Sequence, residues 1–254
     1  MLQLERMQVL KEYMLQNKFA KIDELETLMD VSKATVRRCL LLLESEGFLH
    51  TARGGAVLNS DGILFEQPYY IKRDTHVEEK IRIAKKACEL VGDDMSIFLD
   101  SSTTVTQMCP FLHKQKNLMV ATNDIQIALE LKDHTNVSVV VAGGVLRRNF
   151  CTLTGMYTEM MLKEMNFEYA FISSDVVNEQ GDMMITNLEE VQAKRIVTKS
   201  SAKIVALCDH SKFEGSSFVK VCGLSDVSTI ITGRELPKHI YEHYREMGLD
   251  ILLA

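Results

Sequence analysis

The strongest constraint on the fold of this chain is an alternation of short apolar segments and amphipathic segments in residues 76–254. Strands that are apolar on both faces and separated by helices form largely parallel sheets covered by helices on both sides. The pattern predicts strands at residues 96–99, 118–121, 137–142, 169–173, 203–208, 229–231 and 251–253, and helices at 77–91, 103–112, 125–131, 156–165, 188–198 and 239–247. We therefore expect an α/β domain with a mainly parallel sheet over residues 76–254.

The first 58 residues carry a different pattern, that of a small helical domain. One helix is expected to end near Asn17, a short second helix to begin near Asp23, and a third to begin after Ser32 and extend to about Glu46. Two short strands are expected in residues 48–58 around a bend that contains Gly54 and Gly55. A short helix, a tight turn, a third helix and a hairpin together indicate a winged helix-turn-helix domain in residues 1–58.

The third helix begins with side chains that suit the DNA major groove. Ser32 is a good N-cap, and short or basic hydrogen-bond donors occupy the first two turns. We expect DNA contacts from Ser32, Lys33, Thr35, Arg37 and Arg38 and, in the wing, from Arg53. Taken alone, this helix also fits an ordinary amphipathic surface helix, because short motifs match by chance.

The charge distribution leaves room for DNA as a partner. The net charge is −6, but residues 1–58 contain eight Lys or Arg and eight Asp or Glu, so the excess acid lies in residues 59–254. A small basic face, doubled in an oligomer, is enough for phosphate contacts. Residues 59–75 contain Pro68 and lack strong periodicity, and we interpret them as a linker between the two domains.

Polar residues follow the predicted strands at the edge where ligands bind in parallel α/β sheets. The Ser-Ser-Thr-Thr loop suits a phosphate at a helix N-terminus, lysine and arginine suit charge-assisted bonds, and aspartates suit sugar hydroxyls. The candidate residues are Asp100, Ser101, Ser102, Thr103, Thr104, Thr122, Asn123, Gly143, Gly144, Arg147, Asp175, Lys194, Asp209, Ser211 and Lys212. Taken one at a time, these residues also fit simple helix caps and turns.

Other classes of protein lack support in the sequence. No G-x-G-x-x-G follows the first predicted strand of this domain, and no P-loop, G-x-S-x-G or H-E-x-x-H is present. The six cysteines are scattered without a C-x-x-C pair, which fits reduced thiols better than disulfides or a zinc site. No membrane span or signal peptide is indicated. We therefore expect a cytoplasmic protein without cofactor, metal or membrane partner.

Several of these motifs together resemble the DeoR family of bacterial transcriptional regulators. The resemblance rests on residues 31–40 and 47–56 in the first domain, and on residues 98–104, 122–123, 143–147, 171–175, 190–195 and 209–213 in the second. The family resemblance implies a sensor domain similar in fold to ribose-5-phosphate isomerase that binds phosphorylated sugars or related metabolites. It also implies a repressor of a carbohydrate operon, acting on double-stranded operator DNA as a homo-oligomer, a dimer or tetramer.

The chain departs from the family pattern at several positions. Cys39 stands where the family usually has aspartate, and Ser102 and Val176 replace glycines of the sensor domain. In the wing, Thr51 and Arg53 also differ from the usual residues, and His210 adds a titratable group beside Ser211-Lys212.

Two alternative functions remain. One is a sugar-phosphate isomerase-like enzyme using Asp100, Asp175 and Lys194, against which the attached DNA-binding domain argues. The other is a constitutive DNA binder with an impaired sensor pocket, which Ser102 and Val176 suggest.

Overall fold

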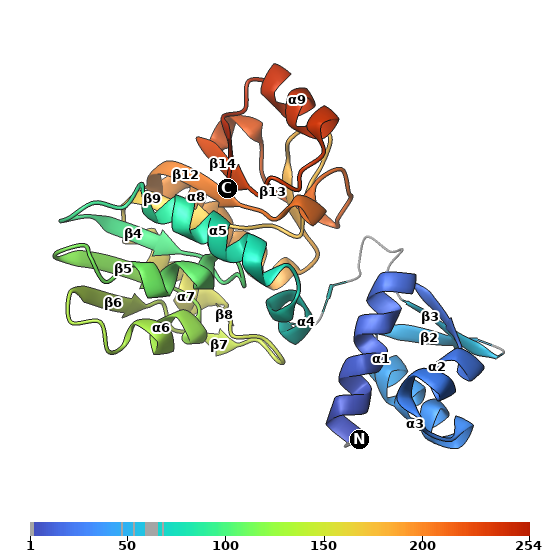
Figure 1. Cartoon of the computed structure of the whole chain (residues 1–254). Helices are drawn as coiled ribbons and strands as arrows, with labels where there is room; N and C mark the ends of the chain where they lie inside the picture. Colours follow the sequence, from blue (N-terminus) through green and yellow to red (C-terminus); the bar gives the residue numbers. More distant parts are fainter. Residues whose placement is uncertain (1–2, 47, 53, 59–65, 68) are drawn as a thin grey trace. The chain divides into compact units, whose positions relative to one another are not determined.

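The computed structural model describes residues 3–46, 48–52, 54–58, 66–67 and 69–254. The chain forms two compact units, residues 1–67 and residues 68–254 (Figure 1). We expected a linker over residues 59–75, but residues 68–75 belong to the second unit. Two positions of interest from the sequence, Gly47 at the end of the third helix and Arg53 in the wing, lie outside the described residues.

The first unit is a winged helix-turn-helix, as predicted. Its sheet is antiparallel with the order β1-β3-β2, so that β3 pairs with both neighbours. Strand β1 was not predicted, and α2 begins at Ile22 with Lys21 as its N-cap rather than at Asp23. The elements are α1 (Gln3–Asn17), β1 (Phe19–Lys21), α2 (Ile22–Met29), α3 (Lys33–Ser45), β2 (Leu49–Ala52) and β3 (Gly55–Leu58).

Gly55 has a specific role in this hairpin. A Cβ atom at this position would lie 2.3 Å from the carbonyl oxygen of Ala20 on the neighbouring strand. Any side chain would therefore force β3 away from β1, which explains a glycine at the start of β3.

The second unit is built on a seven-stranded sheet with the order β15-β14-β12-β9-β4-β5-β6. Every pair of neighbouring strands in this sheet is parallel, as the continuous apolar segments predicted. The strands are β4 (Ser96–Leu99), β5 (Leu118–Thr122), β6 (Val137–Val141), β9 (Phe167–Ile172), β12 (Ser201–Leu207), β14 (Thr229–Thr232) and β15 (Ile251–Leu253).

The strand order changes direction between β4 and β9. From β4 the chain adds β5 and β6 on one side, and it then returns to add β9, β12, β14 and β15 on the other. Such a reversal opens a crevice at the carboxyl ends of the two central strands, which is where open α/β sheets bind ligands.

Helices cover the sheet on both faces. Helices α5 and α6 and the segment η1 pack on one face, against Ile97, Leu99 and Leu207, whereas α7, α8 and α9 pack on the other, against Phe98 and Ile172. The helical segments are α4 (Tyr69–Asp74), α5 (Val77–Cys88), η1 (Val105–Phe111), α6 (Ile125–Leu131), α7 (Met156–Lys163), α8 (Leu188–Ser200), η2 (His210–Lys212), η3 (Leu224–Asp226) and α9 (Lys238–Glu246).

Several smaller elements differ from the prediction. Residues 103–112 form the 3₁₀ segment η1 instead of an α-helix, and this segment contains Pro110, which lacks a backbone donor. Helix α4 lies in the segment expected to be a linker. Short antiparallel strands were also missed: β7 (Val145–Leu146), β8 (Leu153–Thr154), β10 (Val176–Val177) and β11 (Met183–Ile185). Strand β11 also pairs with β13 (Val219–Cys222). Among the described residues, no helix has the length and apolar character to span a membrane.

Candidate functional site

The third helix of the first unit presents the polar residues that the sequence indicated. Ser32 is the N-cap of α3, and its Oγ accepts a hydrogen bond from the backbone N–H of Thr35 at 3.4 Å. Val36, Leu40 and Leu43 are buried, while Arg37 and Arg38 are exposed. The helix therefore has an apolar inner face, and its exposed basic residues lie in its first two turns, whereas Leu41, further along, is 59% exposed.

Two residues of α3 are not free, exposed side chains: Lys33 is paired with a carboxylate, and Cys39 is buried. The Nζ of Lys33 lies 2.6 Å from Asp23, and this contact, first through the hydrogen bond and then through charge, raises the pKa of Lys33. Cys39 is only 3% exposed and packs inside the unit. The departure at Cys39 thus falls on the inner face, not among the exposed donors.

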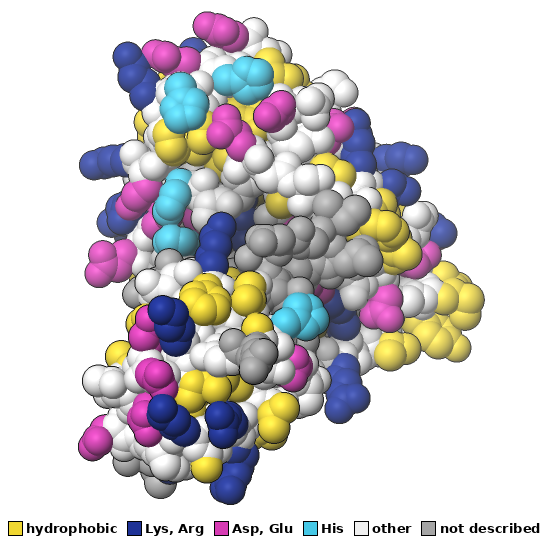
Figure 2. All heavy atoms as spheres, turned by 90° about the vertical axis from the view of Figure 1, so that its right-hand side faces the viewer, with side chains coloured by type: hydrophobic (Ala, Val, Ile, Leu, Met, Phe, Trp, Pro, Cys, Tyr) yellow, Lys and Arg dark blue, Asp and Glu magenta, His cyan; other side chains and the backbone are white. Residues whose placement is uncertain are grey.

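The positive charge of the chain is local. On the face in Figure 2, Lys and Arg side chains stand among Asp and Glu side chains rather than in one broad basic surface. The exposed basic residues at the start of α3, Lys33, Arg37 and Arg38, are therefore a small local group.

In the second unit, Asp100 and Lys194 form a buried ion pair at the carboxyl ends of β4 and β9. Their side chains are 3% and 6% exposed, and the ammonium group of Lys194 contacts Asp100 Oδ2 directly. The same carboxylate accepts a hydrogen bond from the Ser173 backbone N–H at 3.0 Å, and Lys194 donates to the Ser173 carbonyl at 3.2 Å. Burial opposes the charge on Lys194, but Asp100 outweighs it and raises the pKa of the lysine. This ion pair connects α8 to the point between β4 and β9 where the strand order reverses, which we call the switch point.

Asp175, after β9, is paired with Lys72 and feels the charge of Lys212. Lys72 Nζ of α4 lies 2.8 Å from Asp175 Oδ1, and the Thr186 N–H donates to Oδ2 at 2.9 Å. Burial alone would raise the pKa of Asp175, but Lys72 and Lys212 outweigh burial and hold this pKa below its ordinary value. Asp175 is therefore ionised at neutral pH.

Asp209, after β12, faces a second set of basic groups. It is 1% exposed and accepts a hydrogen bond from the Ser211 N–H at 3.0 Å. Burial raises its pKa, but Lys212, the Ser211 hydroxyl and Lys80 more than offset burial and lower it. The buried Lys80 has its own pKa lowered to about 8, first because burial disfavours its charge, with Lys212 and Lys72 adding to the effect. Lys72, Lys80 and Lys212 thus lie around Asp175 and Asp209 in one cluster, which we call the lysine cluster.

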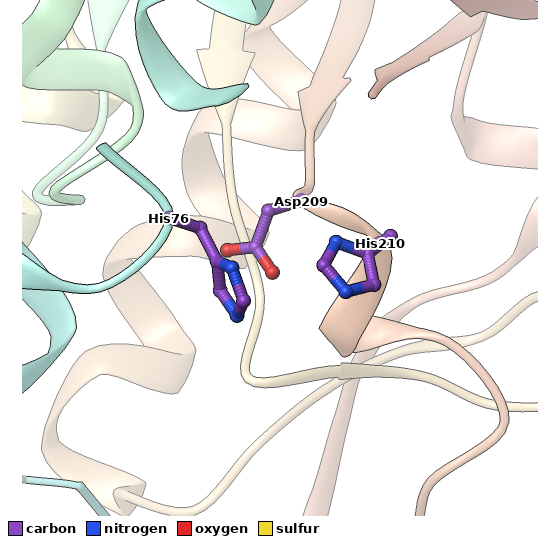
Figure 3. A group of neighbouring side chains, drawn as sticks. All are labelled: His76, Asp209 and His210. Carbon is purple, nitrogen blue, oxygen red and sulfur yellow. The ribbon is translucent and has the colours of Figure 1, made fainter. Parts of the chain in front are cut away.

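Two histidines lie beside the same carboxylate. Figure 3 shows Asp209 between the rings of His76 and His210, with ligand atoms of the three residues within 4.8 Å of one another. His210 is oriented by Glu79, which lies 2.8 Å from its Nδ1 and accepts its backbone N–H. Two imidazoles and a carboxylate suit a transition metal. However, the positive charges of Lys80 and Lys212 also act on the Asp209 carboxylate. These charges make the surroundings of Asp209 a better match for an anion than for a metal cation.

The loop after β4 is fixed by internal hydrogen bonds. Ser101 Oγ donates to Asp124 Oδ2 at 2.5 Å and lies 2.6 Å from Thr152 Oγ1. Ser102 Oγ accepts the Thr104 N–H at 3.2 Å, while Thr103 Oγ1 donates to the Lys72 carbonyl at 3.3 Å. Because the seven-residue η1 that follows is a 3₁₀ segment, the helix dipole expected at this loop is not provided.

The candidate residues at the ends of β5 and β6 are mostly engaged within the protein. Thr122 is fully buried and donates to the Leu99 carbonyl at 2.7 Å, and Asn123 donates to the Leu153 carbonyl at 3.1 Å. Arg147 pairs with Glu190 at 2.7 Å, and its guanidinium lies 3.8 Å from the centre of the Phe150 ring.

The two glycines after β6 make room for α7. A Cβ on Gly144 would lie 2.2 Å from Thr158 Oγ1, whereas a Cβ on Gly143 would meet open space. These strand ends thus differ from the lysine cluster: they position the loops.

Sequence reasoning missed Lys72, Lys80 and Glu79 as members of the site. Lys72 lies in the segment expected to be a linker. Lys80 and Glu79 did offer a signal, because both lie on the buried face of α5, and charged residues are seldom buried without a partner. Of the candidates named from sequence, the structure brings Asp175, Asp209 and Lys212 together around one cluster, with Asp100 and Lys194 paired beside Ser173.

Comparison with known proteins bears on both units. Two family models match the chain, the DeoR C terminal sensor domain over residues 75–234 and the DeoR-like helix-turn-helix domain over residues 6–61. The HTH-type transcriptional regulator GolR of Listeria innocua is 31% identical over 239 residues, which cover 94% of each protein. The glycerol-3-phosphate regulon repressor of Escherichia coli K12 is 26% identical over 254 residues, which cover 100% of each. Among solved structures, a D-ribose-5-phosphate isomerase in complex with phospho-erythronic acid matches 54% of this chain and 53% of its own, with 16% identity and a TM-score of 0.41.

Proposed function

This chain belongs to the DeoR family of HTH-type transcriptional regulators, and we propose that it represses a carbohydrate operon until a phosphorylated sugar or related metabolite binds its second unit. The relative that is named a glycerol-3-phosphate regulon repressor supports this ligand class. The observation that carries the proposal is the lysine cluster at the switch point of the sheet. Three ammonium groups lie there around Asp175 and Asp209, and ammonium groups form charge-assisted hydrogen bonds with phosphate oxygens.

Each part of the cluster has an expected role. Lys212 is the first candidate for the phosphate, because no ion pair engages its side chain in the part of the chain that the structure describes. Lys80 adds a buried positive charge to the cluster, because it lies near Lys212 and Lys72. Asp175 and Asp209 carry carboxylate oxygens that accept hydrogen bonds from sugar hydroxyls.

Lys72 offers a route from the ligand to the DNA-binding unit. Its ammonium group pairs with Asp175, while its carbonyl accepts hydrogen bonds from Lys80 and Thr103, so α4 is held against the cluster. The chain that arrives from the first unit enters the second through α4. A phosphate that draws Lys72 away from Asp175 would shift α4 and the connection to the first unit. The ligand changes operator affinity only by its different affinity for the two states, typically about 1–3 kcal/mol.

DNA contact is assigned to the start of α3. We propose that Ser32, Lys33, Thr35, Arg37 and Arg38 contact the major groove. The wing contact expected from the sequence for Arg53 falls outside the described residues. Paired half-sites call for at least two copies of the chain, so we propose a homo-oligomer. We also propose that the chain acts in the cytoplasm, where its operator DNA lies.

An enzymatic role has weaker support. The carboxylate and the lysine that an isomerase would need, Asp100 and Lys194, are buried and paired with each other. The proposal that the chain regulates without catalysing a reaction is tested by incubating the purified chain with ribose 5-phosphate and measuring isomerisation. Turnover at rates typical of enzymes, about 1–1,000 per second, would overturn it.

The ligand proposal is tested by thermal-shift screening of phosphorylated sugars, each beside its unphosphorylated parent. A ligand at 100 times its Kd stabilises the folded chain by about 2.7 kcal/mol. We expect at least one phosphorylated compound to stabilise the chain, with Lys212→Met losing the effect and Lys85→Met, at an exposed position of α5, keeping it. A flat response across the panel would instead favour the constitutive DNA binder.

The route through α4 has its own test. We expect Lys72→Met to bind operator DNA as the unaltered chain does, but to lose most of the ligand-induced release. If the ligand releases DNA from Lys72→Met and from the unaltered chain equally, the coupling does not pass through Lys72.

A further inference from the structure

Helix α7 has two apolar faces, and only one of them is buried. Thr158 and Leu162 face the interior, whereas Met156, Tyr157 and Met160 are 63%, 67% and 55% exposed. These exposed residues, with Met161, follow the i, i+1, i+4, i+5 spacing of one helical stripe. An amphipathic helix on a globular domain normally turns charged or polar residues outward. This stripe therefore lacks the composition of a solvent-facing surface.

The apolar surface extends beyond the helix. Strand β8 and helix α8 contact α7. Strand β7, which pairs with β8, adds Val145 at 69% and Leu146 at 50% exposure, and the start of α8 adds Leu188 at 62%. We call these residues the α7 surface: Val145, Leu146, Met156, Tyr157, Met160, Met161 and Leu188. Exposed apolar patches of this breadth mark sites of interaction rather than ordinary surface.

We propose that a second copy of the chain binds at the α7 surface. A standard interface buries about 800 Å² on each partner, and seven large apolar side chains, each 36–69% exposed, are enough to form its centre. Methionine and tyrosine are also enriched at such centres, where charged residues are depleted.

The charges beside the stripe favour a two-fold pairing. Glu159 and Lys163 lie one turn apart on α7 and flank the same side of the stripe. In an isologous contact whose two-fold axis is perpendicular to α7, each helix meets its own copy in antiparallel orientation, so the carboxylate of one copy can lie near the ammonium group of the other. The surface is thus complementary to itself in charge.

The α7 surface also touches the loop that follows β6 at the carboxyl edge of the sheet. Gly143 N lies 3.4 Å from Met161 Sδ, and the Gly143 carbonyl accepts a hydrogen bond from Thr158 at 2.9 Å. Arg147, in the loop between β7 and β8, pairs with Glu190 of α8. An interface at α7 therefore shares loops with the edge of the sheet where the ligand is proposed to bind. The inference rests on the proposed function in one respect, the need for two recognition helices.

The test is the mass of the full-length chain in sedimentation velocity. We expect the unaltered chain to be a dimer or larger at micromolar concentration, and Met160→Glu to raise the dissociation constant about 30-fold or more. Leu129→Glu is the matched control, because Leu129 is 56% exposed on α6, which covers the opposite face of the sheet. Val145→Lys, on a different element, should dissociate the oligomer as Met160→Glu does. Thermal melting checks that each variant folds.

The outcomes separate this inference from the proposed function. A monomeric unaltered chain, or a Met160→Glu variant with unchanged mass, overturns the interface whatever the chain does with DNA. An unaltered dimer that dissociates in Met160→Glu but not in Leu129→Glu supports the interface, even if neither form binds the operator. Loss of operator binding by an intact dimer would count against the proposed function alone.

Discussion

The buried pair between Asp100 and Lys194 allows a quantitative prediction. Asp100→Asn keeps the size of the side chain but leaves the ammonium group of Lys194, 6% exposed, without its counter-ion. Breaking a buried pair by removing one partner costs about 3–5 kcal/mol, against a total stability of about 5–15 kcal/mol. At about 2–4 °C per kcal/mol for a unit of this size, we expect the melting temperature of the second unit to fall by roughly 6–20 °C.

Calorimetry suits this measurement, because the chain has two compact units and no tryptophan. Asp133→Asn is the control, since the Asp133 side chain is 82% exposed and its loss should change stability by less than about 0.5 kcal/mol. Replacing both partners, as in Asp100→Leu with Lys194→Met, should recover much of the loss, because neither charge of the pair is then left buried without its partner. A loss below about 1 kcal/mol in Asp100→Asn would refute the reasoning that this pair holds α8 to the switch point.

Three further predictions concern binding. Lys212→Met should weaken binding of a phosphorylated sugar by about 1.5–3 kcal/mol, roughly 10- to 150-fold by calorimetric titration, and an unchanged Kd would remove Lys212 from the site. Because burial lowers the pKa of Lys80 to about 8, its charge is present below this pH and is lost above it. Affinity for the phosphorylated sugar should therefore fall between pH 7 and pH 9.5, and Lys80→Arg, which keeps its charge, should not show the fall. Arg37→Ala or Arg38→Ala should cost about 1–3 kcal/mol of operator affinity if the arginine contacts a base edge, and equal affinity of both variants and the unaltered chain in gel shifts would contradict the assignment.

The sequence predicted the large elements because the physics that forms them is local. Segments such as residues 137–141 and 203–207 are apolar along most of their length, which indicates buried parallel strands before any tertiary contact is known. Ser32 identified the start of α3 by its capping chemistry. Short elements were missed for the opposite reason: β7, β8, β10 and β11 have two or three residues each, too few for a period to emerge.

Parts of the candidate site followed from topology alone. The carboxyl ends of parallel strands share one edge, so Asp100, Asp175 and Asp209 could be expected near each other. Pairings between distant residues could not be predicted in this way. Lys72 and Asp175 are 103 positions apart, and only the docking of α4 brings them within 2.8 Å.

The exposure of the apolar stripe of α7 also could not be predicted from the sequence. Periodicity indicates which residues of a helix share a face, but the two apolar faces of α7 differ only in what packs against them. Similarly, Cys39 drew attention as a departure in a DNA-reading helix, and its burial shows that it belongs to the core of the first unit.

The most direct test of the account is operator binding measured with and without a phosphorylated sugar. The DNA is the promoter of the chain's own gene, and each compound is compared with its unphosphorylated parent. We expect at least one phosphorylated compound to weaken operator binding by about 5- to 150-fold, with no effect of the parent sugar and no effect on Lys212→Met. Release of the operator by parent sugars alone, or equal release in Lys212→Met, would contradict the claim that the lysine cluster senses a phosphate and controls the DNA-binding unit.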